Sequence, residues 1–252
     1  MLEVTRLSKE YDSDDPSARV TVLSDFDLRV PAGDFAVLVG PSGCGKTSFF
    51  DILVGSASAD SGNIAWNGVA VPNLCGLCAY MQQKDLLLPW LPLFENVLLP
   101  RRVRGHVSRD DIDEARALFA RLGLEGFEGF LPSSVSGGMR QRCALARTLM
   151  MRGECVLLDE PLSALDAITR RSLRELLLLL QSEFGKTVLM ITHDVEEAIA
   201  LADDIYVLGT QPMAIREKIR LSSPKPRSAA QEEFVALRER ILESLAPTGA
   251  RR

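Results

Sequence analysis

The sequence has little of what builds disulfide-linked, membrane-spanning or nucleic-acid-binding proteins. No apolar run approaches the roughly 20 residues that cross a bilayer, and residues 1–4 lack the basic and apolar regions of a signal peptide. The 252 residues carry 29 Lys and Arg against 34 Asp and Glu, a net charge of −5 with no basic block to grip a phosphate backbone. We therefore expect a globular cytoplasmic protein that is not integral to a membrane and binds no nucleic acid.

Cysteine and histidine are also scarce. The cysteines form an odd number, and most have apolar or small neighbours, which suits reduced thiols: Cys44, Cys75, Cys78, Cys143 and Cys155. Cys75 and Cys78 have the spacing of a zinc-ligand pair, but the sequence has no second such pair and only two histidines. We interpret this segment as a strand with two small apolar residues, and His106, beside Gly105, as a solvated side chain.

A glycine-rich segment follows the apolar run 35–39 and precedes a second apolar run that begins at Phe49, an order typical of a buried strand, a loop and a helix. Its glycines let several backbone N–H groups point at one place, and the helix start adds its positive end, so the segment predicts a phosphate site rather than a plain turn. Lys46 would reach the outer phosphates, and the Thr47 hydroxyl would bind the bridging Mg²⁺. The candidate nucleotide-binding residues here are Gly40, Pro41, Ser42, Gly43, Cys44, Gly45, Lys46, Thr47 and Ser48.

Two adjacent carboxylates narrow the choice among kinases, GTPases and motors, all of which have phosphate loops. Asp159 and Glu160 end the apolar run 156–158, where a phosphate-loop enzyme places its Mg²⁺ ligand. Asp159 fits that role, and Glu160 fits a base that deprotonates a water in line with the γ-phosphate. Exposed carboxylates at a strand end are common in isolation, but beside a phosphate loop they indicate nucleotide hydrolysis.

The segment Ser136, Gly137 and Gly138 predicts a second phosphate nest at a helix start. One nucleotide cannot easily use both nests, and a small-molecule kinase needs no second one. At this point the sequence resembles the ATP-binding subunits of ABC transporters, in which this signature serves the nucleotide of the opposite subunit. The resemblance runs from residue 2 to about 227. Val135 and Met139 stand where the family usually has Leu and Gln.

The resemblance implies ATP and Mg²⁺ as cofactors and further site residues. It places Tyr11 on the adenine ring, with a strand-end aromatic as the alternative, and Gln83, or its neighbour Gln82, on the Q-loop. It makes His193 the switch histidine and residues 163–166 the D-loop. The implied catalytic residues are Lys46, Gln83, Glu160 and His193, and the implied metal ligands are Thr47, Gln83 and Asp159.

The resemblance also implies partners. Residues 86–90, with 223–227, are similar to the nitrate, sulfonate and taurine importers, a branch that includes transporters of thiamine precursors. This similarity implies a homodimer in the ATP-bound state, a permease that docks near Leu86, Leu87 and Trp90, and an external solute-binding protein. It also implies that the chain lies on the cytoplasmic face of the membrane. Core positions for Leu86 and Leu88 remain an alternative. The competing class is an ABC ATPase of DNA repair or of the ribosome, which typically has insertions, paired cassettes or basic patches.

We predict an α/β protein: a phosphate-loop NTPase core with a parallel sheet, an N-terminal antiparallel β subdomain and an inserted helical subdomain. The ATPase domain should cover residues 1–228, with its core at 1–83 and 152–228 and its helical part at 84–151, before a helical tail at 229–252. Asn67 and Gly68 predict a hairpin. Ser108 with Asp111 predicts a helix cap. Strands are expected at 2–11, 20–30, 35–39, 63–66, 69–71, 77–81, 155–158, 187–192 and 205–208. Helices are expected at 108–122, 136–149, 165–183 and 195–202, and the helix of the tail should end at about residue 245.

Overall fold

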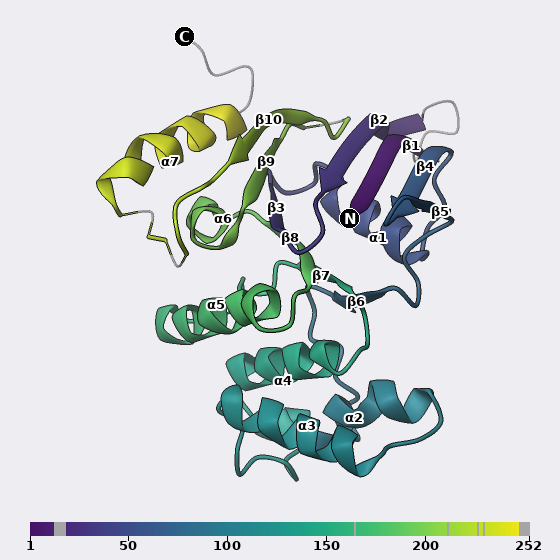
Figure 1. Cartoon of the computed structure of the whole chain (residues 1–252), viewed down its shortest axis with the longest axis vertical. Coiled ribbons are helices and arrows are strands. Elements are labelled where there is room, and N and C mark those ends of the chain that lie inside the picture. Colours follow the sequence, from purple (N-terminus) through teal and green to yellow (C-terminus); the bar gives the residue numbers. More distant parts are fainter. Residues whose placement is uncertain (13–18, 164, 211, 226, 229, 247–252) are drawn as a thin grey trace. The chain divides into compact units, whose positions relative to one another are not determined.

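The computed structural model describes residues 1–12, 19–163, 165–210, 212–225, 227–228 and 230–246 (Figure 1). The chain forms two units, one from Met1–Cys75 with Leu178–Arg252 and the other from Gly76–Leu177. Some predicted features fall partly outside the described residues: the D-loop at Ala164, the segment 223–227 at Pro226, and the tail 229–252 at residues 229 and 247–252.

The first unit contains an antiparallel sheet near the N-terminus. Its strands are β1 (Leu2–Asp12), β2 (Arg19–Val30), β4 (Ser61–Trp66) and β5 (Val69–Val71), in the order β2-β1-β4-β5. Asn67 and Gly68 join β4 to β5 with φ angles of 51° and 79°, the left-handed values that a tight hairpin requires. The predicted antiparallel subdomain and its hairpin are therefore confirmed.

The same unit contains parallel strands that lead to the phosphate loop. β3 (Phe35–Val39) pairs in parallel with β8 (Thr187–Thr192) on one side and β9 (Asp204–Leu208) on the other. Every residue of these three strands is buried, as their continuous apolar sequences predict. The fourth strand, β10 (Ile215–Arg220), runs antiparallel to β9 and was not predicted. The helices of this unit are α1 (Lys46–Val54), α6 (Val195–Leu201) and α7 (Glu232–Leu245).

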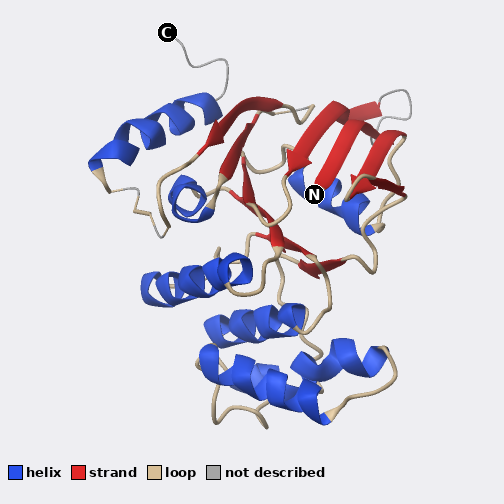
Figure 2. Cartoon of the chain, in the orientation of Figure 1, coloured by secondary structure: helices blue, strands red, loops and turns tan. Residues whose placement is uncertain are grey.

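The second unit is mostly helical. β6 (Cys78–Met81) and β7 (Cys155–Asp159) pair in parallel, and residues 82–154 between them, all described, hold helices and loops but no strand (Figure 2). These helices are α2 (Leu93–Val103), α3 (Arg109–Arg121), a 3₁₀ turn at Pro132–Ser134 and α4 (Gly137–Leu149). α5 (Ala167–Ser182) follows β7 and belongs to this unit as far as Leu177. The cap of α3 is confirmed, because the Asp111 amide donates to the Ser108 hydroxyl at 3.1 Å and the Ser108 amide donates to the Asp111 carboxylate at 2.9 Å.

The cysteines correct one detail. All five thiols are free, but β6 begins at Cys78, so Cys75 lies outside the strand, and its side chain is exposed. A strand spanning both cysteines was therefore a wrong prediction. Cys143 and Cys155 are buried, and burial raises the pKa of the Cys143 thiol to about 12, which keeps it protonated and unreactive at neutral pH.

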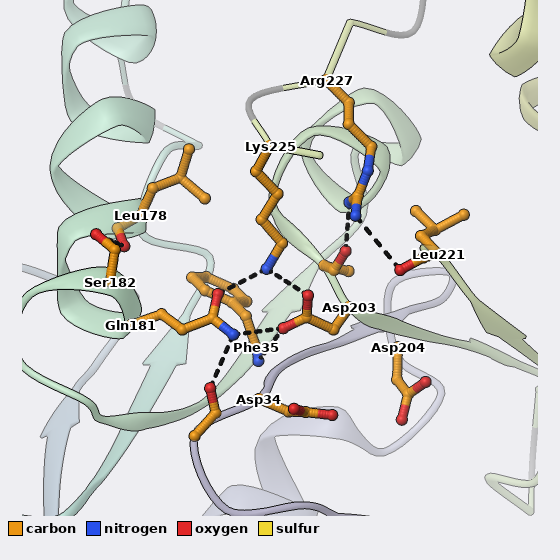
Figure 3. A network of polar contacts seen from close by, with 12 residues as sticks. Asp34, Phe35, Leu178, Gln181, Ser182, Asp203, Asp204, Leu221, Lys225 and Arg227 are labelled. Carbon is orange, nitrogen blue, oxygen red and sulfur yellow. Dashed lines mark hydrogen bonds and ion pairs between the residues drawn. The ribbon is translucent and has the colours of Figure 1, made fainter. Parts of the chain in front are cut away.

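A half-buried polar network fastens the segment after β10 to the parallel strands (Figure 3). The Lys225 ammonium lies 2.9 Å from the Asp203 carboxylate and donates to the Gln181 side chain at 2.7 Å. Gln181 in turn donates to Asp203 at 2.6 Å and to the Gly33 carbonyl at 2.8 Å, and the Phe35 amide donates to Asp203 at 2.9 Å. Each oxygen of the Asp203 carboxylate thus has a donor, and one of these donors is the amide of Phe35, the first residue of β3.

Candidate functional site

The glycine-rich segment leads from the buried end of β3 into α1. Gly45 caps α1 with a φ of 114°, a value that other residues rarely adopt. A Cβ atom at Gly40 would lie 2.9 Å from the Leu208 Cβ, so only glycine fits there without movement. The loop therefore keeps its curl at a fixed place beside β9.

Lys46 is the first residue of α1 and is buried. Its ammonium donates to the Gly40 and Pro41 carbonyls, each at 2.8 Å, so the loop holds the charge next to its own curled backbone. Thr47 is exposed at the same helix start, and Ser48 is half-buried. The helix itself is anchored by the fully buried Phe49, whose ring lies 5.1 Å from that of Phe26. A buried cation, an exposed hydroxyl and a helix N-terminus together suit a phosphate group.

His193 lies in the turn between β8 and α6 and is exposed, so it is not a core histidine. The turn is held on both sides. Asp194 caps α6 by accepting from the Glu196 amide at 2.8 Å, and Thr192 donates to the Glu197 carboxylate at 2.7 Å. Since these bonds fix the backbone around it, the imidazole projects from a rigid support.

Tyr11 lies near the end of β1, opposite Val20 of β2. Its ring is 37% exposed, and the Lys9 ammonium stands 5.2 Å from the ring centroid. An exposed aromatic face is what a stacking base needs. The assignment of Tyr11 to adenine stays a prediction.

Asp159 and Glu160 lie in the second unit, at the end of β7. Asp159 is buried, whereas Glu160 is partly exposed and has a φ of 47°, a strained value for a residue with a side chain. Ser163 holds this turn, because its amide and hydroxyl donate to the Glu160 carbonyl at 3.2 and 3.0 Å.

Gln83 lies beside Glu160. It follows β6, the neighbour of β7, and its side-chain amide donates to the Glu160 carboxylate at 3.2 Å. The structure therefore joins two of the predicted catalytic residues that are 77 positions apart in the sequence. No local pattern pairs them, because the contact depends on the parallel register of β6 and β7.

Ser136 caps α4, and its hydroxyl accepts from the Met139 amide at 3.2 Å. Added Cβ atoms at Gly137 and Gly138 would lie at ordinary contact distances, 3.5 Å or more from their nearest neighbours. Internal packing thus gives no reason for glycine at these two positions. An open helix start that a ligand can approach closely does give one.

The predicted site residues divide between the two units. Tyr11, residues 40–48 and His193 belong to the first unit, and Gln83, residues 136–138, Asp159 and Glu160 belong to the second. The described residues contain no group of three or more His, Cys, Asp and Glu able to hold a metal by themselves. Arg140 and Arg147 of α4, which donate to the loop after Gln83, were missed, although two arginines seven residues apart on one helix mark a common face.

Comparison with known proteins decides the family. The sequence model described as "ABC transporter" matches residues 23–163. The chain belongs to the ABC transporter family.

Among its ABC transporter relatives, an aliphatic sulfonates import ATP-binding protein of Xanthomonas axonopodis pv. citri is 39% identical over 86% of this chain and 86% of its own length. A taurine import ATP-binding protein of Yersinia pestis is 34% identical over 96% of each. A dimeric structure of the ATP-binding cassette MJ0796, in a post-hydrolysis state bound to ADP and Pi, has a TM-score of 0.79 and 26% identity, and covers 89% of this chain and 100% of that one.

This ABC transporter subunit binds and hydrolyses ATP, and the predicted phosphate-loop NTPase fold is confirmed. ATP-binding subunits of this family act with a membrane permease and as dimers. Within the described part of the chain, no helix combines the length and apolar character needed to span a bilayer.

Proposed function

We propose that this subunit energises import of a small anionic or zwitterionic solute, of the sulfonate and taurine type, through a separate permease on whose cytoplasmic face it sits. The relatives named for sulfonate and taurine import, which match over most of both chains, carry this proposal. Nitrate and thiamine-precursor import belong to the same branch by sequence resemblance. An external solute-binding protein would deliver the solute, so no residue of this chain is assigned to cargo.

We assign the phosphate loop to the ATP β- and γ-phosphates. The backbone N–H groups of residues 40–45 would bind phosphate oxygens, and the Lys46 ammonium would leave the Gly40 and Pro41 carbonyls for the γ-phosphate. Mg²⁺ typically takes one or two carboxylates besides phosphate oxygens and water. The buried carboxylate of Asp159 and the exposed hydroxyl of Thr47 fit such a sparse ligand set, and Gln83 would complete it.

Glu160 is the proposed base. Its carboxylate accepts from Gln83, so the amide fixes the direction of the group that is to take a proton from the attacking water. His193, exposed on its rigid turn, would contact the γ-phosphate, and Tyr11 would stack on the adenine. The metal supplies charge compensation at the transferring phosphoryl group, while these side chains position water and nucleotide.

We propose that each ATP site is shared between two copies of this chain. Ser136, Gly137 and Gly138 would bind the γ-phosphate of the ATP held by the phosphate loop of the other copy. The support is the open start of α4, where no internal neighbour explains the glycines. The dimeric arrangement of the similar cassette structure is consistent with this assignment.

A mixed dimer tests the shared site. With Ser136→Arg in one copy and Lys46→Ala in the other, both defects fall in one site and the second site stays intact. We therefore expect about half of the wild-type amount of tightly bound nucleotide, measured by equilibrium binding of a fluorescent ATP analogue to tag-purified heterodimers. Equal loss of nucleotide from both sites would refute the shared site, and a dimer with both changes in the same copy is the matched control.

The loop after Gln83 is the proposed permease contact, with one correction. Trp90 and Leu86 are 70% and 49% exposed, which contradicts a core position for Leu86, but Leu87 is only 8% exposed and is removed from the docking surface. Asn96 holds this loop in place, because its side chain accepts from the Leu88 amide at 2.7 Å and donates to the Leu91 carbonyl at 2.9 Å. A rigid loop with an exposed tryptophan suits an apolar partner helix.

Trp90→Ala should separate docking from folding. Because the ring is largely exposed, we expect the melting temperature and the basal ATPase rate to stay near wild-type, far from the roughly 3–5 kcal/mol that loss of a core tryptophan costs. The free energy of binding to the permease should weaken by about 2 kcal/mol, or roughly 30-fold in affinity, so less permease should co-purify. Trp66→Ala, at a buried tryptophan, is the control for a core effect. A Trp90→Ala protein that melts early yet still binds the permease would place Trp90 in the core.

Wild-type co-purification tests the function itself. A membrane protein that accompanies the subunit and supports ATP-dependent uptake of taurine or an aliphatic sulfonate in proteoliposomes is the expected result. Ribosomal RNA or DNA in place of a membrane partner would overturn it in favour of a non-transport ATPase. The division into a core at 1–83 and 152–228, a helical part at 84–151 and a tail at 229–252 remains our proposal for the domain boundaries.

A further inference from the structure

The loop after Gln83 is fastened to α4 by two arginines, all within the second unit. The Arg140 guanidinium donates to the Asp85 carboxylate at 3.0 Å. Two turns further along α4, Arg147 donates to the Asp85 and Leu86 carbonyls at 2.5 and 2.7 Å. Arg147 thus holds the loop backbone, while Arg140 holds the Asp85 side chain.

Arg140 also contacts the residue that precedes the signature. Its guanidinium donates to the Val135 carbonyl at 3.1 Å, directly before Ser136, and Arg140 itself lies in the first turn of α4. Asp85 holds its own loop in the same way, since it accepts from the Leu87 amide at 3.3 Å. The Asp85–Arg140 ion pair therefore joins the segment two residues after Gln83 to the segment one residue before Ser136.

We propose that Arg140 is a positioning residue that couples the two ATP sites of the dimer through Asp85. This inference rests on the proposed shared site, in which Gln83 serves the nucleotide of its own copy and Ser136 serves that of the other copy. A shift of the loop when Gln83 engages one nucleotide would then move the Val135 carbonyl and with it the start of α4. The pair links the two sites without touching either nucleotide.

A merely stabilising ion pair is the competing explanation, and its size allows the two to be separated. The side chains of Arg140 and Asp85 are 36% and 31% exposed, and pairs this open to solvent contribute little to stability. We therefore expect their removal to lower the melting temperature by no more than about 4 °C. Any large change in ATP hydrolysis must then come from positioning.

A double-mutant cycle tests the proposal on the purified full chain: Asp85→Asn, Arg140→Gln and both together, assayed for ATP hydrolysis with Mg·ATP. Each single change should lower kcat about fivefold to tenfold, with KM changed less than twofold and the Hill coefficient falling towards 1. The double variant should be no worse than either single one, because both remove the same contact. Arg140→Lys, which keeps the charge, should restore most of the rate.

The control is Arg116→Gln, which removes an exposed ion pair of Arg116 with Asp113 on α3, at 3.4 Å in the same unit, and should change neither kcat nor the Hill coefficient. Additive losses in the double variant, or a wild-type kcat and Hill coefficient in the singles, would overturn the coupling. If the wild-type chain itself hydrolyses no ATP, the proposed function fails instead. The two failures are therefore distinguishable.

Discussion

Lys46→Ala should lower the rate of ATP hydrolysis by a factor on the order of 10² or more, because it removes a positioned positive charge at the transferring phosphoryl group. The effect should be large because Lys46 is buried and its ammonium is already held at 2.8 Å from two loop carbonyls, so that no solvent-exposed side chain can take its place. The measurement is steady-state phosphate release by the purified subunit.

Folding has to be checked in the same samples, since the Gly40 and Pro41 carbonyls lose their donor in this variant. Melting curves and circular dichroism should show a folded protein, and Lys186→Ala, at the turn before β8, is the matched lysine control. Near-wild-type turnover in folded Lys46→Ala protein is incompatible with a phosphate loop at residues 40–47.

Glu160→Gln should bind ATP and stop before hydrolysis. The amide keeps the shape of the side chain and can still accept from Gln83, now 3.2 Å from the Glu160 carboxylate, but it cannot take a proton from water. A general base contributes a factor of about 10² to 10⁴, so turnover should fall by that much. The variant should accumulate as an ATP-bound dimer, which size-exclusion chromatography with Mg·ATP detects.

The matched control is Glu125→Gln, an exposed carboxylate in the loop after α3, which should elute and turn over like the wild-type. A Glu160→Gln protein that stays monomeric and hydrolyses ATP at full speed would rule out Glu160 as the base. A monomeric protein that is also inactive would separate the base from dimer formation, and so contradict only the shared site.

Most of the fold could be predicted because the strands that matter are either continuous and apolar or separated by distinct turn residues. β3, β8 and β9 are buried on both faces, and Asn67 with Gly68 marks the hairpin directly. β10 was missed because its residues, Ile-Arg-Glu-Lys-Ile-Arg, are mostly charged and alternate between half-buried and exposed. Such a strand exists because β9 offers an edge to pair with, which no local pattern reveals.

The site divides in the same way. The residues of the phosphate loop are close in sequence, so their spacing alone predicts a curled backbone. In the structure, Gly40 and Gly45 occupy positions of this loop that favour glycine. The contact of Gln83 with Glu160 and the hold of Arg140 on Asp85 join distant segments and depend on strand register and helix placement. The buried position of Leu87 was equally hidden, because an apolar run does not say which of its side chains turns inward.

Arg227, in the segment after β10, limits how far this chain can be shortened from its C-terminal end. Its buried guanidinium donates to the Ala202 carbonyl at 2.5 Å, just past the end of α6, and to the Ser223 carbonyl at 2.6 Å. A chain cut at residue 221 would lose Arg227 and also Lys225, and would leave the half-buried Asp203 carboxylate without its cation, which is destabilising. The Phe35 amide that Asp203 accepts from begins the strand that ends at the phosphate loop, so the minimal ATPase has to extend beyond its last sheet strand.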